Sequence, residues 1–210
     1  MGCVTIRKKR MFFKKGGMKL SNKEKEIEEI AIIDLETTGT DPYSDAIVEI
    51  GICKLNLKTG EIVPLFDKIC QEKNNEIKGN AWIFKNSDLE YDDVKKAPDL
   101  TTFRNEIQHI LNEYAVTSYN QKFDFNFLKN KGFTIEKKFW DPMFKAQYIL
   151  KILRYNGEYK WPSFQEAWNY FFPNHKYTEI HRAFDDAFHE AQLIYEIYKI
   201  ENGCEKKNGI

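Results

Sequence analysis

The chain has 210 residues, of which 42% are hydrophobic and 15% aromatic, and its 32 basic residues balance 32 acidic ones. This length and composition are typical of a single domain with a buried core. No apolar run approaches the about 18 residues that a membrane span needs, and the first residues lack a signal-peptide pattern. We therefore expect a cytoplasmic protein that has no membrane partner.

The charge is unevenly distributed along the chain. Residues 1–20 carry seven Lys or Arg and no acid, which leaves seven net negative charges on residues 21–210. Such a basic tail either holds a polyanion by releasing counterions or is simply solvated. A solvated tail could result from a start codon assigned upstream of Met11 or Met18. We favour the solvated tail. The expected regions are a flexible basic tail over 1–24, a folded domain over 25–201 and a polar tail over 202–210.

The cysteines are scattered without any CxxC pair, which indicates neither a zinc site nor a disulfide framework. We expect reduced cysteines that serve in packing. They are Cys3, Cys53, Cys70 and Cys204.

The first half of the chain predicts three strands, at about residues 30–36, 45–56 and 62–71. Only a short turn, LKTGE, separates the second strand from the third. Strands that are joined this tightly form an antiparallel meander. A loop-rich stretch is expected to follow, over residues 72–98.

The second half predicts mainly helices, which makes the chain a mixed α/β domain. In residues 99–115 the apolar side chains share one helical face, namely Phe103, Ile107, Ile110, Leu111 and Tyr114. A helix from residue 123 should stop at Gly132. The remaining expected elements are short strands at 116–120 and 138–141 and helices at 141–153, 162–172 and 182–200.

Two acidic residues interrupt the first strand in the sequence AIIDLETTG. Asp34 and Glu36 project from the same face, about 6.6 Å apart along the backbone, because side chains alternate across a strand. No Lys or Arg lies in this stretch, so two buried carboxylates would repel each other unless a metal ion sits between them. Hard oxygen ligands suit Mg²⁺ or Mn²⁺. The alternative is an acidic pair at a solvated strand end.

Two later stretches carry further candidate ligands. Asp124 lies at the start of a helix, where an acid is either a partner of the helix dipole or another ligand. His181 precedes a helix with Asp185 and Asp186 in its first turn. Taken alone, each of these residues is more typical of a helix cap or of surface decoration.

The three stretches together resemble the DEDDh 3′-to-5′ exonucleases, the family of the proofreading epsilon subunit of DNA polymerase III, oligoribonuclease and ribonuclease T. The resemblance lies in the order and spacing of DLETTG, YNQKFD and HRAFDD. It extends to EIG after the first motif and to FQEAWNYF before the last, and it covers roughly residues 28–198. The family's tyrosine branch would need Tyr where Arg182 stands, so the histidine branch is indicated.

The resemblance implies a ribonuclease-H-like α/β fold, with a mixed sheet of three antiparallel and two parallel strands flanked by helices. It also implies that residues 25–201 are an exonuclease domain. In that domain His181 would be the general base. Four carboxylates would bind two Mg²⁺ or Mn²⁺ ions, namely Asp34, Glu36, Asp124 and Asp186.

By the same resemblance, several residues would contact the substrate. Thr37, Thr38 and Gly39 would lie by the 3′-terminal nucleotide, and Asn120 would hold that neighbourhood by hydrogen bonds. Trp82, Ile83 and Phe84 either stack on the terminal bases or pack in the core.

The implied function is metal-dependent release of nucleoside monophosphates from single-stranded 3′ ends, with DNA favoured as substrate. The alternatives are a 3′-to-5′ exoribonuclease and a catalytically silent nucleic-acid-binding module. An acidic domain should bind single-stranded ends weakly and act distributively. The chain ends soon after the last helix, without the extension by which a proofreading subunit attaches to its polymerase. We therefore expect a free-standing enzyme. The sequence does not indicate its oligomeric state.

The last helix distinguishes its two adjacent acids by register. With Ala187 toward the core, Asp185 is expected on the solvated face, alongside His189, Gln192 and Glu196. Asp186 is expected on the flank, where its side chain can reach the edge of the sheet.

Overall fold

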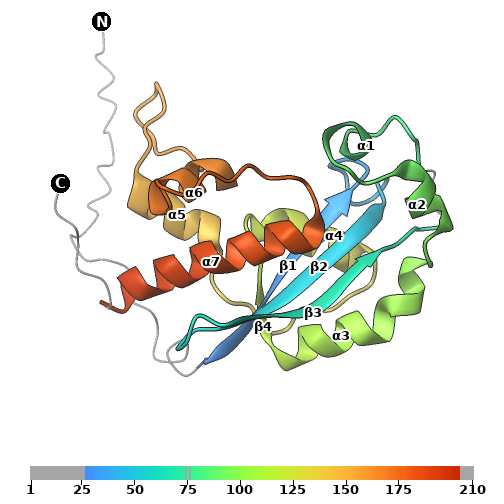
Figure 1. Ribbon diagram of the computed structural model, residues 1–210, viewed down its shortest axis with the longest axis horizontal. Coiled ribbons are helices and arrows are strands. Elements are labelled where there is room, and N and C mark those ends of the chain that lie inside the picture. Colours follow the sequence, from blue (N-terminus) through green and yellow to red (C-terminus); the bar gives the residue numbers. More distant parts are fainter. Residues whose placement is uncertain (1–26, 74, 76, 204–210) are drawn as a thin grey trace, which may run out of the picture.

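The computed structural model describes residues 27–73, 75 and 77–203, so the expected basic tail and most of the polar tail lie outside the described residues. Four strands form one mixed sheet in the order β3-β2-β1-β4, in which β1 is antiparallel to β2 and parallel to β4 (Figure 1). The strands are β1 Glu29–Thr37, β2 Ile47–Asn56, β3 Ile62–Ile69 and β4 Ala115–Thr117.

Seven α-helices and a short 3₁₀ helix are described around this sheet. They are α1 Ile83–Asn86, α2 Tyr91–Lys96, the 3₁₀ helix η2 Leu100–Phe103, α3 Arg104–Glu113, α4 Gln121–Asn130, α5 Pro142–Leu150, α6 Phe164–Phe171 and α7 Ala183–Glu201. The predicted mixed α/β class and the meander of the first three strands are confirmed. No helix in the described part of the chain is long and apolar enough to cross a membrane.

The expected fifth strand at residues 138–141 is wrong. Lys138 forms only an isolated parallel bridge with Val116 of β4. The extended stretch ends early because Asp141 caps α5, its side chain accepting a hydrogen bond from the Met143 backbone, and Pro142 opens the helix. Among the described residues, the segment therefore pairs with β4 through only two backbone hydrogen bonds, from Val116 to Lys137 and from Phe139 to Val116.

The alternation of side chains gives the sheet two buried faces. On one face Ile30, Ile32 and Cys53 pack with α5, α6 and α7. On the other face Ala31 and Ile33 pack with α3 and α4. Figure 1 shows α7 running across its face of β1 and β2. Because Asp34 and Glu36 continue the first series, they face α7.

The stretch expected to be loop-rich contains the short helices α1 and α2. Ile83 and Val94 from these helices are buried against Val48 of β2. Ile83 is therefore a core residue, whereas Trp82 is 56% exposed. Both residues were expected either to stack on terminal bases or to pack in the core, and the structure places Ile83 in the core and Trp82 at the surface.

The start of α7 is fastened to β2 by two contacts. Gly51 leaves room for the helix, since a Cβ at this position would lie 2.2 Å from the carbonyl carbon of Ala183. Two residues earlier on β2, the buried Glu49 carboxylate accepts hydrogen bonds from the Arg182 guanidinium and from the Ala183 backbone N–H. Gly51 pairs with Asp34 across the strands, so this anchor brings the first turn of α7 directly over the β1 carboxylates.

Candidate active site

The predicted acidic residues converge at the carboxyl end of β1. Asp34 and Glu36 come from β1, Asp124 from the first turn of α4 and Asp186 from the first turn of α7. Glu36, Asp124 and Asp186 are all buried. His181 lies in the segment just before α7 and has a positive φ of 56°, a left-handed conformation that is uncommon for a residue with a side chain.

Three of these residues form a compact group of ligand atoms. One atom each from Glu36, His181 and Asp186 lie within 4.8 Å of one another. Such a spacing allows one cation to lie between the Glu36 and Asp186 carboxylates with the His181 ring beside it, because oxygen ligands lie at about 2.0–2.6 Å from hard divalent ions. The residues are brought together from β1, from the segment before α7 and from α7 itself.

Burial and neighbouring acids raise the pKa values of both β1 carboxyls, Asp34 and Glu36. Burial, and then repulsion by the Glu190 and Asp124 carboxylates, raise the pKa of Asp34 well above its ordinary value. Burial, followed by repulsion from Asp186 and Glu49, raises the pKa of Glu36 to about 9. Acids in such a site ionise together only when a cation joins them.

Asp124 gives an independent indication of a missing ligand. Its side chain is 3% exposed, and its Oδ1 atom has no hydrogen-bond partner. Burial raises the pKa of this carboxyl to about 7. Buried carboxylate oxygens without a partner are rare, since they lose hydration without any replacement. The donor set and this oxygen both fit a divalent cation.

Asp185 and Asp186 differ in environment, but not entirely as their register predicts. Asp186 is 5% exposed and belongs to the acidic cluster, as expected. Asp185 is only half-buried, and its expected place on a solvated face is wrong. The Tyr177 hydroxyl lies 2.6 Å from Asp186 Oδ1 and 2.9 Å from Asp185 Oδ2, and so contacts both acids. The segment before α7 covers this side of the helix, which helical periodicity alone does not reveal.

The expected solvent-directed position of His189 is also wrong. Its ring stacks on the Tyr177 ring with centroids 3.6 Å apart, and it meets Trp168 edge-on. Its Nδ1 atom lies 2.8 Å from the Asp185 carbonyl oxygen. His189 is thus held in an aromatic stack, whereas His181 is the histidine that lies beside Glu36 and Asp186.

Sequence reasoning missed a further buried acid, Glu190. It lies one turn after Asp186 on α7, is 5% exposed, and accepts a hydrogen bond from the Tyr119 backbone N–H. Burial and the Asp124 charge raise the pKa of Glu190 well above its ordinary value. The spacing of four residues from Asp186 was a usable signal, because it puts both acids on one helical face.

The expected substrate-binding residues lie around the end of β1 and the start of α4. The Thr37 hydroxyl donates to the Gly39 carbonyl, and the Thr38 hydroxyl accepts from the Ala46 backbone N–H. Asn120 precedes α4 with a φ of 67°. A cavity of about 190 Å³ lies between these two segments; its lining residues are Thr40, Pro42, Asn120, Lys122, Phe123, Asn126 and Phe127.

Trp82 is the one expected stacking residue that contacts the site directly. Its ring meets the His181 ring edge-to-face, with centroids 4.8 Å apart. It is also largely exposed, as a residue that stacks on a ligand must be.

Residues 31–194 match the protein-family model described as Exonuclease. The chain is similar to the PolC-type DNA polymerase III of Caldanaerobacter subterraneus subsp. tengcongensis, with 26% identity over 173 residues. This match covers 80% of the chain but 11% of the relative, so the chain spans about a tenth of that curated protein.

Solved structures show the same fold. The nuclease domain of 3′hExo, a DEDDh family member bound to rAMP, superposes with a TM-score of 0.62 and 17% identity, covering 87% of this chain and 96% of that one. E. coli exonuclease I in complex with a dT13 oligonucleotide has a TM-score of 0.60 and 13% identity, covering 84% and 42%. The chain belongs to the exonuclease family that this model describes.

The raised pKa values predict that stability without metal falls as the pH rises. Glu36 and Asp124 have folded-state pKa values of about 9 and about 7, above the about 4 of an unfolded acid. Their contribution to stability is complete below the unfolded pKa and is lost as the pH rises through the folded values. In chelator, the melting temperature should therefore fall between about pH 5 and pH 9.

Divalent ions should raise the melting temperature more at pH 8.5 than at pH 5.5, because ligand carboxylates must be deprotonated. Thermal unfolding with and without Mg²⁺ or Mn²⁺ at both pH values measures this. A metal-induced shift that is larger at the lower pH would contradict the assignment.

Proposed function

We propose that this chain is a metal-dependent 3′-to-5′ exonuclease that releases nucleoside monophosphates from single-stranded nucleic acid, with DNA as the preferred substrate. The observation that carries the proposal is the convergence of Glu36, His181 and Asp186 within 4.8 Å, next to Asp34 and to Asp124, whose Oδ1 atom has no hydrogen-bond partner. We assign the activity to a domain over residues 25–201.

Each residue has a distinct role in the proposed reaction. Asp34, Glu36, Asp124 and Asp186 hold two divalent ions, Mg²⁺ or Mn²⁺. When bound, these ions supply an activated water and stabilise charge on the attacking and leaving oxygens. A ring nitrogen of His181 would accept the proton of the attacking water, since an imidazole is the side chain that most often serves as a general base.

The 3′-terminal nucleotide lies, in this proposal, between the residues that follow β1 and the start of α4. Thr37, Thr38 and Gly39 contact it on one side and Asn120 on the other. The exposed Trp82 ring is available to stack on a terminal base, which is worth about 1–3 kcal/mol. Contacts that are confined to the 3′ end of the nucleic acid imply weak binding and distributive action.

The preference for DNA rests on sequence similarity. A PolC-type DNA polymerase III matches 80% of the chain. Among similar structures, one holds rAMP and another a dT13 oligonucleotide, so the fold alone accommodates both kinds of nucleic acid. A direct comparison of the two substrates decides between DNA and RNA.

The test is an assay with 3′-labelled and 5′-labelled single-stranded DNA and RNA oligomers. We expect mononucleotides to be released from the 3′ end with Mg²⁺ or Mn²⁺, faster from DNA, and no release with EDTA. Ca²⁺ should support little turnover, because its looser coordination places the reacting groups less precisely. Cleavage that starts at the 5′ end or persists in chelator would exclude the mechanism. Binding without any cleavage would indicate a silent binding module.

The adjacent acids Asp185 and Asp186 provide a matched pair of variants. Asp186→Asn should abolish activity and weaken Mn²⁺ binding measured by calorimetry, because a charged ligand is lost. Asp185→Asn should keep activity within about fivefold and lower the free energy of unfolding by about 1 kcal/mol, since its contact with Tyr177 is weakened. The reverse order of phenotypes would show that Asp185 is the ligand.

Two histidines provide a second matched pair. His181→Ala should lower kcat by about 10²- to 10⁴-fold, the usual contribution of a general base, with Mn²⁺ affinity close to wild type. His189→Ala removes a ring from the aromatic stack and should leave kcat within about fivefold of wild type. Full activity of His181→Ala at neutral pH would assign the base to another group.

A further inference from the structure

The chain between β1 and β2, residues 38–46, forms a closed loop beside the proposed site. At its neck, Thr38 and Ala46 exchange backbone and side-chain hydrogen bonds. Within the loop the Asp45 carboxylate accepts from the Asp41 backbone N–H at 2.9 Å, and it lies against Gly39, where a Cβ would come within 2.3 Å of it. Asp45 therefore connects the two ends of the loop, at Gly39 and Asp41 on one side and at its own position before Ala46 on the other.

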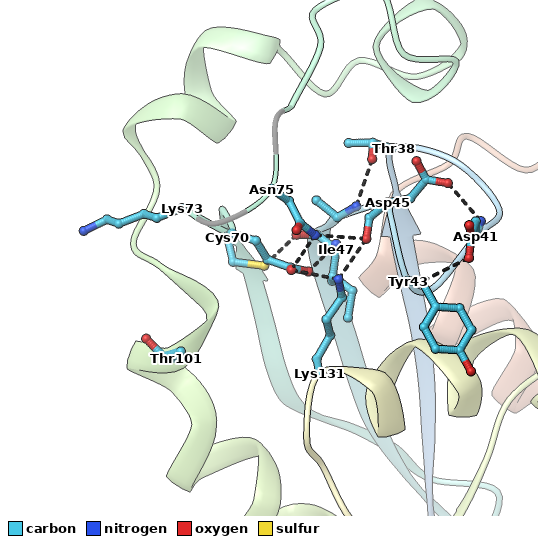
Figure 2. A network of polar contacts seen from close by, with 12 residues as sticks. Thr38, Asp41, Tyr43, Asp45, Ile47, Cys70, Lys73, Asn75, Thr101 and Lys131 are labelled. Atoms are coloured by element: carbon cyan, nitrogen blue, oxygen red, sulfur yellow. Dashed lines mark hydrogen bonds and ion pairs between the residues drawn. The ribbon is translucent and has the colours of Figure 1, made fainter.

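The Asp45 end of the loop is tied to the rest of the protein by a polar network, shown in Figure 2. Lys131, just after α4, donates from Nζ to the Asp45 carbonyl oxygen at 2.9 Å. The same Nζ atom lies 2.9 Å from Glu72 Oε2. Glu72 in turn accepts a hydrogen bond from the Ile47 backbone N–H. A weaker bond, 3.3 Å long, joins the Asn75 side chain to the Asp45 carbonyl.

The ion pair at the centre of this network is largely shielded from water. The side chains of Lys131 and Glu72 are 10% and 12% exposed. Charged hydrogen bonds in such an environment are short and directional, and removing one partner leaves the other buried and unpaired. Lys131 therefore acts as a fixed link between the end of α4 and the loop.

This link joins the two segments that form the walls of the cavity of about 190 Å³, although Lys131 and Asp45 do not themselves line it. Thr40 and Pro42 of the loop form one wall, and Lys122 and Asn126 of α4 are on the other. Because Lys131 joins the end of α4 to Asp45, it sets the separation of these two walls. Thr37, Thr38 and Gly39 lead from Glu36 into the same loop.

We propose that Lys131 is a positioning residue for substrate binding: its bond to Asp45, made rigid by Glu72, holds the 38–46 loop at the separation from α4 that a single-stranded 3′ end requires. This inference rests on the proposed function, because the loop must be a substrate contact for its position to matter. Lys131 itself touches no reacting group.

The test compares Lys131→Met with a control ion pair elsewhere. Lys145 and Glu201 are 2.6 Å apart, with side chains 7% and 12% exposed, and join α5 to α7. Lys145→Met thus removes an ion pair of similar burial without touching the 38–46 loop. Lys131→Arg keeps the charge and can still donate to both acceptors.

Steady-state kinetics on a 3′-labelled DNA oligomer should separate these variants. Lys131→Met should raise KM by about tenfold, since the loop must then be ordered on binding. Its kcat should stay within about threefold. Lys131→Arg should recover most of the affinity, and Lys145→Met should keep the wild-type KM at a temperature where it is folded.

Hydrogen exchange of peptides covering residues 38–46 provides a readout that needs no activity. Exchange should be faster in Lys131→Met and unchanged in Lys145→Met. Asn75→Ala removes the 3.3 Å bond to the Asp45 carbonyl and a 2.9 Å bond to Glu72 Oε2, but it leaves the Lys131 side chain in place. This variant should raise KM by about two- to threefold with a smaller change in exchange, and it carries the test if Lys131→Met does not fold.

The outcomes separate the two proposals. If wild type shows no metal-dependent 3′ cleavage, the proposed function and the substrate role of the loop both fall, whatever the exchange data show. If wild type is active but the Lys131→Met and Asn75→Ala variants keep wild-type KM and loop exchange, the positioning role of Lys131 alone is overturned.

Discussion

The buried Glu49 carboxylate binds both the Arg182 guanidinium and the backbone of Ala183, and so fixes where α7 begins on the sheet. His181 directly precedes that anchor, and Asp186 follows it by three residues. Their approach to Glu36 therefore depends on an interaction that involves none of the proposed catalytic groups. An ion pair that anchors a helix end in this way also completes the start of the helix, where backbone N–H groups lack internal partners.

The acidic cluster is unfavourable in isolation, and the rest of the fold compensates for it. Raised pKa values at Asp34 and Glu36 mean that burial and mutual repulsion oppose ionisation there. The apolar layers on both faces of the sheet supply the opposing free energy, since buried side chains such as Ile32 and Ile33 extend along the same strand as the acids. Stabilising burial is thus concentrated in the cores and electrostatic repulsion at the end of β1, an arrangement common to functional sites.

The resemblance of the three motifs to a known family was enough to predict that Glu36 and Asp186 meet, and the helix register agreed by placing Asp186 on the flank of α7. It was not enough where irregular segments decide the contact. Tyr177 reaches Asp185 from a segment with no periodicity, so the environment of that acid could not be read from the helix. The missing fifth strand has a similar cause, since the cap at Asp141 outweighs the strand propensity of the preceding residues.

The contact at Gly51 limits how this sequence can diverge. The atoms opposite Gly51 belong to the backbone of Ala183 and Phe184, not to side chains. A clash with a neighbouring side chain can be relieved by replacing that side chain with a smaller one. A clash with backbone atoms cannot be relieved in this way. Every single-nucleotide missense change of a glycine codon adds a side chain, so compensating mutations near Gly51 would have to shift α7 as a whole, and with it Asp186. A substitution at Gly51 should therefore be found only in relatives of this chain that have already lost activity.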